Sequence, residues 1–241
     1  MGGPFLRHLM SDTPIKLIIG LGNPGSEHRE DRHNAGYWFV DALARKFDGQ
    51  FRPERRFSGE LARIELHRHD VRLLKPDTFM NRSGTAVQAL SAFLKIAPEE
   101  ILVAHDELDL SPGTVRLKRG GGAGGHNGLR DTIGHIGPDF ARLRIGIGHP
   151  GEASMVTSYV LRRPPPDERE LIDQAIKDAV ASMGLLLGQG FERAMHKLHS
   201  RGKQPKPYRK VPAKDAGAGA DAPHTGAGDD VGGADADKTD N

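Results

Sequence analysis

Five short segments of the chain supply polar side chains that could take part in chemistry. Each lies beside an expected strand or helix, and together they contribute Asn23, His33, Asn81, Asp106 and Asn127. His33 is suited to act as a general base near neutral pH. Asp106 could accept a hydrogen bond from its other ring nitrogen, which would fix the tautomer and stabilise the imidazolium. The asparagine amides could hold ester or amide groups and stabilise an oxyanion.

The sequence also limits the kind of reaction. It contains no cysteine and no serine in a G-x-S-x-G nucleophile elbow. If the polar segments converge, the simplest reaction is direct attack by a water molecule that His33 activates. The alternative is ordinary capping and turn chemistry, since a single His or Asn at a helix start is more often a cap than a catalyst.

The first of these segments, IIGLGNPG, has glycines with the spacing of a dinucleotide-binding loop, at Gly20, Gly22 and Gly25. In a dinucleotide fold the third glycine opens a helix, and an acidic residue about 20 positions on ends the next strand. Here the polar stretch SEHREDRHN follows, and the expected helix begins only near Asn34. The nearest acidic residue at that distance, Asp41, falls inside this helix. The sequence therefore argues against a nicotinamide cofactor and a dehydrogenase.

The same loop has a second explanation. Gly20 and Gly22 would let the chain turn sharply off the preceding strand, and Pro24 would bias Asn23 toward an extended conformation. A rigid loop of this kind would present the Asn23 amide at the carboxyl edge of the sheet, where ligands of open α/β sheets bind. The simpler alternative is that Asn23 only caps the turn.

Two further patterns suggest other sites. His67-x-His69-Asp70 resembles a metal-ligand spacing, but alternation along a strand already places both histidines on one face, and a polar hairpin tip explains them. The glycine loop at residues 120–128 could cradle phosphate. It lacks the G-K-[ST] ending of a P-loop, which argues against nucleoside triphosphate binding. We therefore expect neither a metal nor a cofactor.

Composition and charge limit the classes of protein to which this chain could belong. The absence of cysteine excludes disulfides and fits a cytoplasmic protein, and no apolar run reaches the length of a membrane span. The whole chain carries +2, and residues 215–241, with seven Asp and one Lys, carry −6, so residues 1–214 carry +8. A positive body of this kind suggests an anionic partner such as nucleic acid, or a basic surface without a partner.

The elements that must position these residues alternate along the chain. Apolar and β-branched runs predict strands, and helical spacing of apolar residues predicts helices. Strands are expected at 15–21, 57–66, 70–75, 101–104, 114–118 and 141–147, with a turn between the second and third near His69 and Asp70. Helices are expected at 34–47, at 83–96 with Ser83 as a possible N-cap, after the glycine loop, and at 167–199 with a break near Gly188 and Gly190.

This alternation indicates one α/β domain, with a mixed, twisted β-sheet and helices on both faces. We expect the domain to span residues 14–202. Residues 1–13 are expected to be flexible, and residues 203–241, which contain no Leu, Ile, Phe, Met or Trp, to form a disordered tail that is basic and then acidic.

A series of motifs resembles bacterial peptidyl-tRNA hydrolases. The motifs, in order, are GLGNPG, RHNAG, KPDTFMNRSG, VAHDELDLSPG, RLKRGGGAGGHNGLRD and RLRIGIGHPG. The resemblance covers roughly residues 15–199. It implies a monomeric α/β enzyme of the phosphorylase/hydrolase-like architecture that needs no cofactor. Such an enzyme cleaves the ester between a peptide and the 3′ end of tRNA, which recycles peptidyl-tRNA released from stalled ribosomes.

The resemblance also implies roles for individual residues. It makes His33 the base and Asp106 the partner that sustains its basic form. Asn23 would help to distinguish an N-blocked, peptide-bearing substrate from free aminoacyl-tRNA. Asn81 and Asn127 would contact the 3′ end of the tRNA and the peptide backbone.

Other residues are expected to bind substrate by the same resemblance. Phe79 and Met80 would line the site, and Lys118 and Arg144 would grip tRNA phosphates. His28 stands where the family usually has Tyr, beside the substrate end, and could stack or donate a hydrogen bond. The chain also departs from the family at Asp31, where the family often has Thr. Asp31 could simply cap the following helix.

A non-enzymatic RNA-binding protein on the same scaffold is the competing hypothesis. Chloroplast splicing factors resemble peptidyl-tRNA hydrolases yet act through partner proteins, and fold alone does not settle function. All five polar residues of the expected site are present in this chain, and this favours the enzyme.

Overall fold

The computed structural model describes residues 14–201. All of these residues belong to one compact unit. The flexible segment expected at 1–13 and the basic-then-acidic tail expected at 203–241 lie outside the described residues, and both stay predictions.

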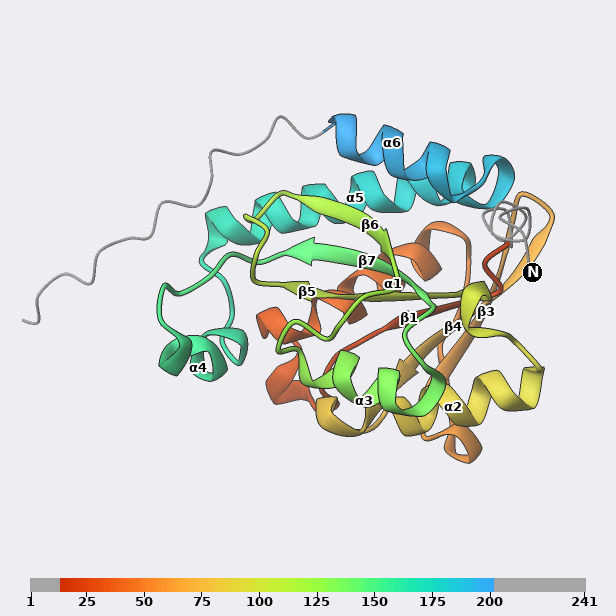
Figure 1. The fold of residues 1–241 in the computed structure, drawn as a ribbon, viewed down its shortest axis with the longest axis horizontal. Helices are drawn as coiled ribbons and strands as arrows, with labels where there is room; N and C mark the ends of the chain where they lie inside the picture. Colours follow the sequence, from red (N-terminus) through yellow and green to blue (C-terminus); the bar gives the residue numbers. More distant parts are fainter. Residues whose placement is uncertain (1–13, 202–241) are drawn as a thin grey trace, which may run out of the picture. The chain divides into compact units, whose positions relative to one another are not determined.

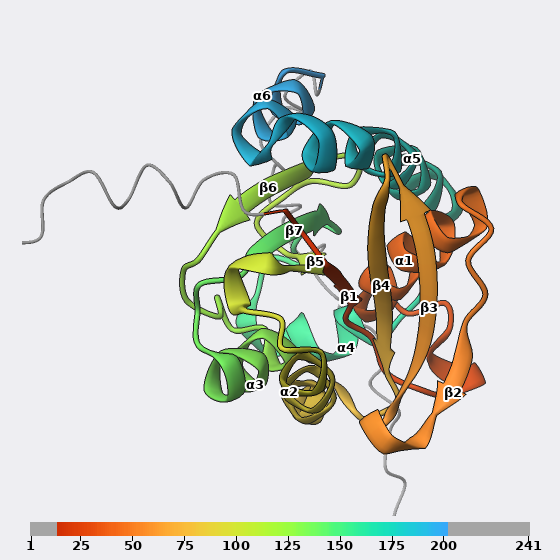
Figure 2. The same ribbon diagram turned by 90° about the vertical axis from the view of Figure 1, so that its right-hand side faces the viewer.

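Seven strands of the described chain form one mixed sheet, in the order β2-β3-β4-β1-β5-β7-β6 (Figures 1 and 2). Four central strands, β4, β1, β5 and β7, run parallel, and β2, β3 and β6 are antiparallel to their neighbours. The strands are β1 (Leu17–Gly20), β2 (Arg52–Glu54), β3 (Gly59–Leu66), β4 (His69–Pro76), β5 (Ile101–Glu107), β6 (Val115–Arg119) and β7 (Ala141–Gly146). The mixed sheet expected from the sequence is confirmed.

Helices cover both faces of this sheet, as expected. One face carries α1 (Ala35–Lys46), α5 (Pro166–Gln189) and α6 (Phe191–Arg201), and the other carries α2 (Ser83–Leu94) and α3 (Asn127–Ile136) (Figure 2). A short helix, α4 (Val156–Val160), follows β7 (Figure 1). The expected break in the last helical region falls at Gly190, between α5 and α6. No helix within residues 14–201 is long and apolar enough to cross a membrane.

Strand β1 is buried on both faces and separates two hydrophobic cores. Ile18 packs into the core shared with Phe39 of α1, whereas Leu17 and Ile19 pack into the core shared with Val87 of α2. Successive side chains of a strand point to opposite faces, so a short apolar run can contribute to both cores. Each such side chain stabilises the fold by roughly 1.5–3 kcal/mol on burial.

Two glycines let helix α1 approach the centre of the sheet closely. A Cβ atom on Gly20 would lie 2.4 Å from the carbonyl oxygen of Gly36, in the first turn of α1. A Cβ on Gly36 would lie 2.4 Å from the carbonyl oxygen of Ala104 in β5. Both distances are too short for a real contact, so only glycine fits at these positions.

The explanation given above for the opening loop was partly wrong. Gly20 and Gly22 do not have positive φ. A larger residue is excluded at these positions because Gly20 packs on α1 and Gly22 lies against the Tyr37 ring. The residue that needs glycine for its conformation is Gly25, with φ +103°. A single 3₁₀ turn follows it rather than an α-helix, so the loop lacks the helix N-terminus that holds a pyrophosphate.

Other local expectations also need correction. The hairpin between β3 and β4 turns at His67 and Arg68, which have φ of 50° and 64°, and not at His69 and Asp70, which begin β4. Ser83 does not cap α2: it is the first helical residue, and its hydroxyl donates to the carbonyl of Met80. Strand β2 and helix α4 were not predicted.

Candidate active site

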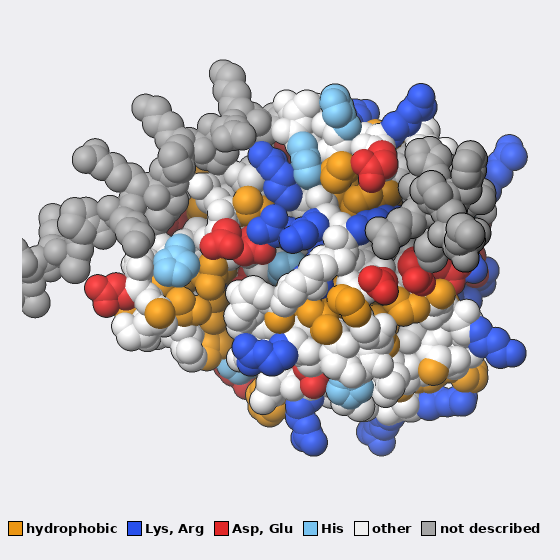
Figure 3. Space-filling model, in the orientation of Figure 1, with side chains coloured by type: hydrophobic (Ala, Val, Ile, Leu, Met, Phe, Trp, Pro, Cys, Tyr) orange, Lys and Arg blue, Asp and Glu red, His pale blue; other side chains and the backbone are white. Residues whose placement is uncertain are grey.

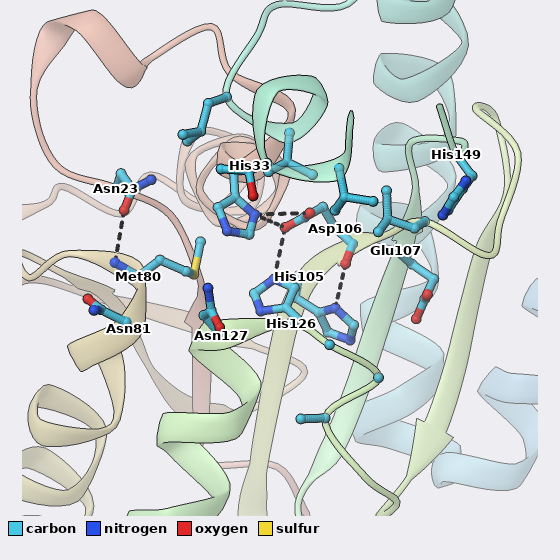
Figure 4. Close-up of a pocket in the computed structure, with 18 of the residues that line it drawn as sticks. Asn23, His33, Met80, Asn81, His105, Asp106, Glu107, His126, Asn127 and His149 are labelled. Atoms are coloured by element: carbon cyan, nitrogen blue, oxygen red, sulfur yellow. Dashed lines mark hydrogen bonds and ion pairs between the residues drawn. The ribbon is translucent and has the colours of Figure 1, made fainter. Parts of the chain in front are cut away.

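A cavity of about 700 Å³ opens at the carboxyl ends of the parallel strands (Figure 4). This edge of an open α/β sheet is where ligands usually bind. The loops that follow β1, β4 and β5, the turn before α1 and the start of α3 all reach it. Of the residues predicted from the sequence, those that line the cavity are Asn23, His33, Phe79, Met80, Asn81, Asp106 and Asn127.

His33 and Asp106 form the centre of the cavity. His33 lies on the 3₁₀ turn before α1, and its Nδ1 is 3.0 Å from both carboxylate oxygens of Asp106 in β5. Because a carboxylate only accepts hydrogen bonds, Nδ1 must carry the proton. The Nε2 atom then keeps its lone pair and is free to accept a proton in the cavity (Figure 4). The contact expected from the sequence is therefore present.

Burial and charge act in opposite directions on this pair. Burial lowers the pKa of His33, but the neighbouring Asp106 carboxylate raises it more, so that the pKa lies above its ordinary value of 6.5. Burial raises the pKa of Asp106, and the neighbouring His33 and His126 lower it well below its ordinary value. Asp106 thus stays ionised at neutral pH and keeps His33 in the tautomer that a base requires.

Two further histidines hold Asp106 in place, and sequence reasoning gave them no role. His126, the N-cap of α3, accepts a hydrogen bond at Nδ1 from the Leu129 amide and places Nε2 2.9 Å from Asp106 Oδ1. Its Nε2 is therefore a donor in the neutral ring. His105 donates from Nδ1 to the Asp106 carbonyl, and burial lowers its pKa to about 3. The only sequence signal for His126 was its position before a helix.

Asn23 is held rigidly by its surroundings and does not simply cap a turn. The Asn34 side chain bonds both the amide and the carbonyl of Asn23, at 2.8 and 2.9 Å. The Asn23 side-chain oxygen accepts from the Met80 amide at 2.8 Å. This leaves the side-chain nitrogen of Asn23 as a donor at the cavity (Figure 4).

The other predicted residues form the rim of the cavity. Phe79 is 62% exposed, whereas its neighbour Met80 is buried against the site. Asn81 is exposed on the same side. Asn127 opens α3, and its side-chain oxygen accepts from Arg130, which leaves its amide nitrogen available for a ligand.

Three predicted binding residues do not line the cavity. His28 bonds through Nδ1 to the carboxylate of Asp31, 2.8 Å away, and that carboxylate makes no cap hydrogen bond. Arg144 on β7 pairs with Glu107, which does line the cavity, at 2.8 Å. Lys118 is exposed on β6. Lys and Arg side chains gather over β6 and β7, beside the apolar side chains over α4 (Figure 3).

The glycine loop before α3 is fastened to the sheet by one buried side chain. Arg142 of β7 donates from one guanidinium nitrogen to the carbonyl of Gly122, 2.5 Å away, and from the other to that of Gly121. This loop leads directly to His126 and Asn127. The carbonyls of Gly121 and Gly122 thus face the arginine, and these hydrogen bonds fix the path of the loop toward the site.

One group of side chains could hold a metal ion. His33, Asp106 and His126 place ligand atoms within 4.8 Å of one another, and this is the only such group within residues 14–201. The same atoms are engaged in the two His–Asp hydrogen bonds, so a metal would have to displace both protons. The HRHD segment contributes no such group, and the expectation of no metal stays a prediction.

Comparison with known proteins decides the family. The family model described as peptidyl-tRNA hydrolase matches residues 17–207. The chain belongs to the peptidyl-tRNA hydrolase family. Peptidyl-tRNA hydrolases of Actinobacillus succinogenes and Halorhodospira halophila are 54% and 55% identical to it over 189 and 187 residues. These alignments cover 78% and 77% of this chain and 97% and 96% of the relatives.

Solved structures of peptidyl-tRNA hydrolases agree with this assignment. The crystal structure of the Acinetobacter baumannii enzyme is 52% identical, with a TM-score of 0.76, and covers 78% of this chain and 95% of its own. A peptidyl-tRNA hydrolase in complex with N-propanol is 53% identical, with a TM-score of 0.75, over 76% and 94% of the two chains. The chain is thus a hydrolase that acts on the ester bond of peptidyl-tRNA.

Proposed function

We propose that His33 is the general base that activates water against the ester of peptidyl-tRNA, with Asp106 as its orienting partner. The observation that carries this proposal is the contact of His33 Nδ1 with both oxygens of the Asp106 carboxylate. That contact supports a neutral imidazole whose Nε2 lone pair is available in the cavity. General bases of this kind contribute about 10²–10⁴-fold to a rate.

The reaction then needs no covalent enzyme intermediate. A water oxygen attacks the ester carbonyl carbon, and its proton passes to His33 Nε2. The tetrahedral intermediate collapses with cleavage of the bond between the carbonyl carbon and the ribose 3′ oxygen. The imidazolium returns its proton to that oxygen, which gives tRNA with a 3′ hydroxyl. The peptide leaves with a free carboxyl group, which releases the second proton of the water to solvent. Asp106 stabilises the imidazolium without accepting the proton.

Three amides position the substrate in this proposal. The side-chain nitrogen of Asn23 donates to the oxyanion or to the carbonyl oxygen of the acyl group that blocks the substrate's amino group, because the Asn23 side-chain oxygen is already engaged by Met80. Asn81 and Asn127, which lie near each other at the rim of the cavity (Figure 4), contact the 3′ end and the peptide backbone. Phe79 packs on the substrate from the exposed edge.

Contacts outside the cavity bind the tRNA. Lys118 and Arg144 grip its phosphates, and His28 contacts the substrate end. The enzyme acts as a monomer in the cytoplasm, without metal or cofactor, on peptidyl-tRNA released from stalled ribosomes. The basic side chains over β6 and β7 (Figure 3) support the proposal that tRNA binds on this side of the molecule.

The test is hydrolysis of an N-blocked aminoacyl-tRNA beside the unblocked one, with and without a chelator. We expect the wild type to cleave only the blocked ester, and His33→Ala to lose about 10²–10⁴-fold of that activity. His69→Ala, at the start of β4, is the matched control and should keep it. Full activity in His33→Ala would remove His33 from the mechanism, and tRNA binding without cleavage by the wild type would favour an RNA-binding protein.

A further inference from the structure

A buried arginine precedes the proposed base in the chain. Arg32 is only 5% exposed, and it lies on the same 3₁₀ turn as His33. Burying a guanidinium is costly unless its donors are satisfied. The partners of Arg32 therefore indicate what this side chain is for.

Those partners are backbone carbonyls at the end of helix α4. One guanidinium nitrogen of Arg32 lies 3.3 Å from the carbonyl oxygen of Tyr159 and 3.2 Å from those of Arg162 and Arg163. The backbone amide of Arg32 also donates to the Arg162 carbonyl, at 3.1 Å. The last carbonyls of a helix have no partner within the helix. Arg32 thus caps α4 from another part of the chain.

Two more contacts fix the guanidinium itself. Its other terminal nitrogen pairs with Glu168 of α5 at 2.9 Å, and its plane lies 4.0 Å from the centre of the Tyr159 ring. The Tyr159 hydroxyl in turn donates to the carbonyl of Ile147, after β7, at 2.6 Å. Arg32 therefore joins the turn of the base, the end of α4 and the start of α5.

Helix α4 depends on such contacts because it is very short. It has five residues, far fewer than a helix needs to be stable by itself in water. Yet it forms a wall of the cavity, through Val156, Thr157, Val160 and the following Leu161. The Arg32 contacts fix this wall relative to His33, together with the packing of Val160 in the core and the Tyr159 hydrogen bond to Ile147.

We propose that Arg32 is a positioning residue that sets the distance between the α4 wall and His33, and with it the binding of the aminoacyl part of the substrate. Arg32 does not line the cavity and does not touch the substrate. It acts because its side chain holds backbone carbonyls in α4 and in the segment just after it, while the next residue along its own backbone is His33. This inference rests on the proposed function for its kinetic readout, but the contacts themselves can be tested without substrate.

The experiment compares Arg32→Lys with Arg169→Lys. Lysine keeps the charge but lacks the planar fork that holds several carbonyls and stacks on a ring. Arg169 is a matched control, because it also combines ion pairs, to Glu30 and Asp173, with stacking at 3.8 Å over an aromatic ring, but that ring is Trp38 of α1 and not a residue of α4.

For Arg32→Lys we expect KM for an N-acetylated aminoacyl-tRNA to rise about 10-fold, which corresponds to the loss of about 1.4 kcal/mol of binding. The Kd of deacylated tRNA should stay unchanged, since that ligand lacks the aminoacyl group that the wall contacts. Amide hydrogen exchange at residues 153–163 should accelerate. Arg169→Lys should change none of these quantities. An unchanged KM together with unchanged exchange in Arg32→Lys would overturn the proposal, and so would an equal loss of affinity for deacylated tRNA.

A second variant covers the case in which Arg32→Lys does not fold. Glu168→Gln removes one charged partner of Arg32 but keeps the carbonyl contacts, so a smaller rise of KM in the same direction is expected, and unchanged kinetics would contradict the proposal. If the wild type shows no hydrolysis at all, the proposed function fails. The exchange rates at residues 153–163 would then still decide whether Arg32 holds the wall.

Discussion

Asp106 is the residue on which the site depends most, because three histidines converge on it. Its carboxylate accepts from His33 and His126, and its carbonyl accepts from His105. A buried carboxylate without such donors would be strongly disfavoured. Here the donors stabilise its charge, and that charge in turn raises the pKa of His33.

The pH dependence of activity should therefore respond to Asp106→Asn. In the wild type, His33 becomes neutral, and thus able to act as a base, as the pH rises through its pKa, which lies above 6.5. Activity should therefore fall when the pH is lowered below this pKa. In Asp106→Asn the main raising charge is gone, and burial, which lowers the pKa of His33, remains with only the weaker raising effect of Asp31. The acidic limb of the profile of kcat/KM should shift to lower pH, and kcat should drop by up to about 10⁴-fold because the tautomer is no longer fixed.

The exposed Asp109→Asn, two residues after β5, is the control and should leave the profile unchanged. An acidic limb that stays in place in Asp106→Asn would mean that a group other than His33 controls the rate.

Much of the site could be predicted from residue types alone. His33, Asp106 and Asn23 stand next to element ends, so the topology of a parallel sheet brings them together. The roles of His126 and Arg32 could not be predicted in this way. A histidine at a helix start usually caps, and an arginine usually lies on the surface. Only the tertiary contacts show that His126, besides capping α3, bonds Asp106, and that Arg32 is buried against α4.

At the scale of elements, β6 is one of the two edge strands of the sheet, and α6 packs against it. His199 of α6 accepts a hydrogen bond from the Leu117 amide at 3.0 Å through Nε2. Burial and the nearby cations Arg116 and Arg144 lower the pKa of His199. A side chain thus takes the place of a neighbouring strand at this point.

This contact predicts that the packing of α6 against the edge strand β6 becomes less stable at acidic pH. When His199 contacts Leu117, the pKa of its imidazole is lower than the ordinary value of 6.5. The contact between α6 and β6 therefore contributes its full stability above pH 6.5 and loses stability as the pH falls below that value. Amide exchange at Leu117, corrected for its intrinsic rate, should accelerate on going from neutral to acidic pH. In His199→Gln, whose amide oxygen can accept without titrating, this acceleration should disappear. Equal acceleration in both proteins would assign the effect to another group.

Long, periodic elements were the easiest to predict, and short ones the hardest. Helices α1 and α2 have a buried apolar stripe, and their ends lie close to the expected positions. Strand β2 has three exposed residues, Arg52–Glu54, with a proline in the middle, so no periodicity reveals it. Helix α4 has only five residues, and its contact with Arg32 joins segments that are distant in sequence, so no local pattern reveals it.

At the scale of the whole molecule, residues 1–214 carry a net charge of +8, which is suited to an anionic partner. Among the described residues, Lys118 and Arg144 lie on neighbouring strands at the antiparallel edge of the sheet, close to the mouth of the site through Glu107. Such a surface would give tRNA affinity that falls steeply with salt, because each phosphate contact releases counterions.

Lys118→Ala should weaken tRNA binding and flatten the plot of log Kd against log salt by about 0.7–0.9 units of slope for one lost phosphate contact. Lys46→Ala, at the end of α1, changes the net charge equally and should leave the slope unchanged. If the two variants behave alike, the effect reflects total charge, and the phosphate site lies elsewhere.

The close approach of α1 to the sheet has a consequence for how this enzyme can be damaged. Gly36 stands two residues after the turn that carries His33, and the Ala104 carbonyl that it faces stands two residues before Asp106. A methyl group at Gly36 would act as a wedge between the two backbone segments that hold the base and its partner. A change from hydrogen to methyl at Gly36 would thus disturb the distance between His33 and Asp106, the proposed catalytic pair, while every polar side chain of the site stays in the sequence.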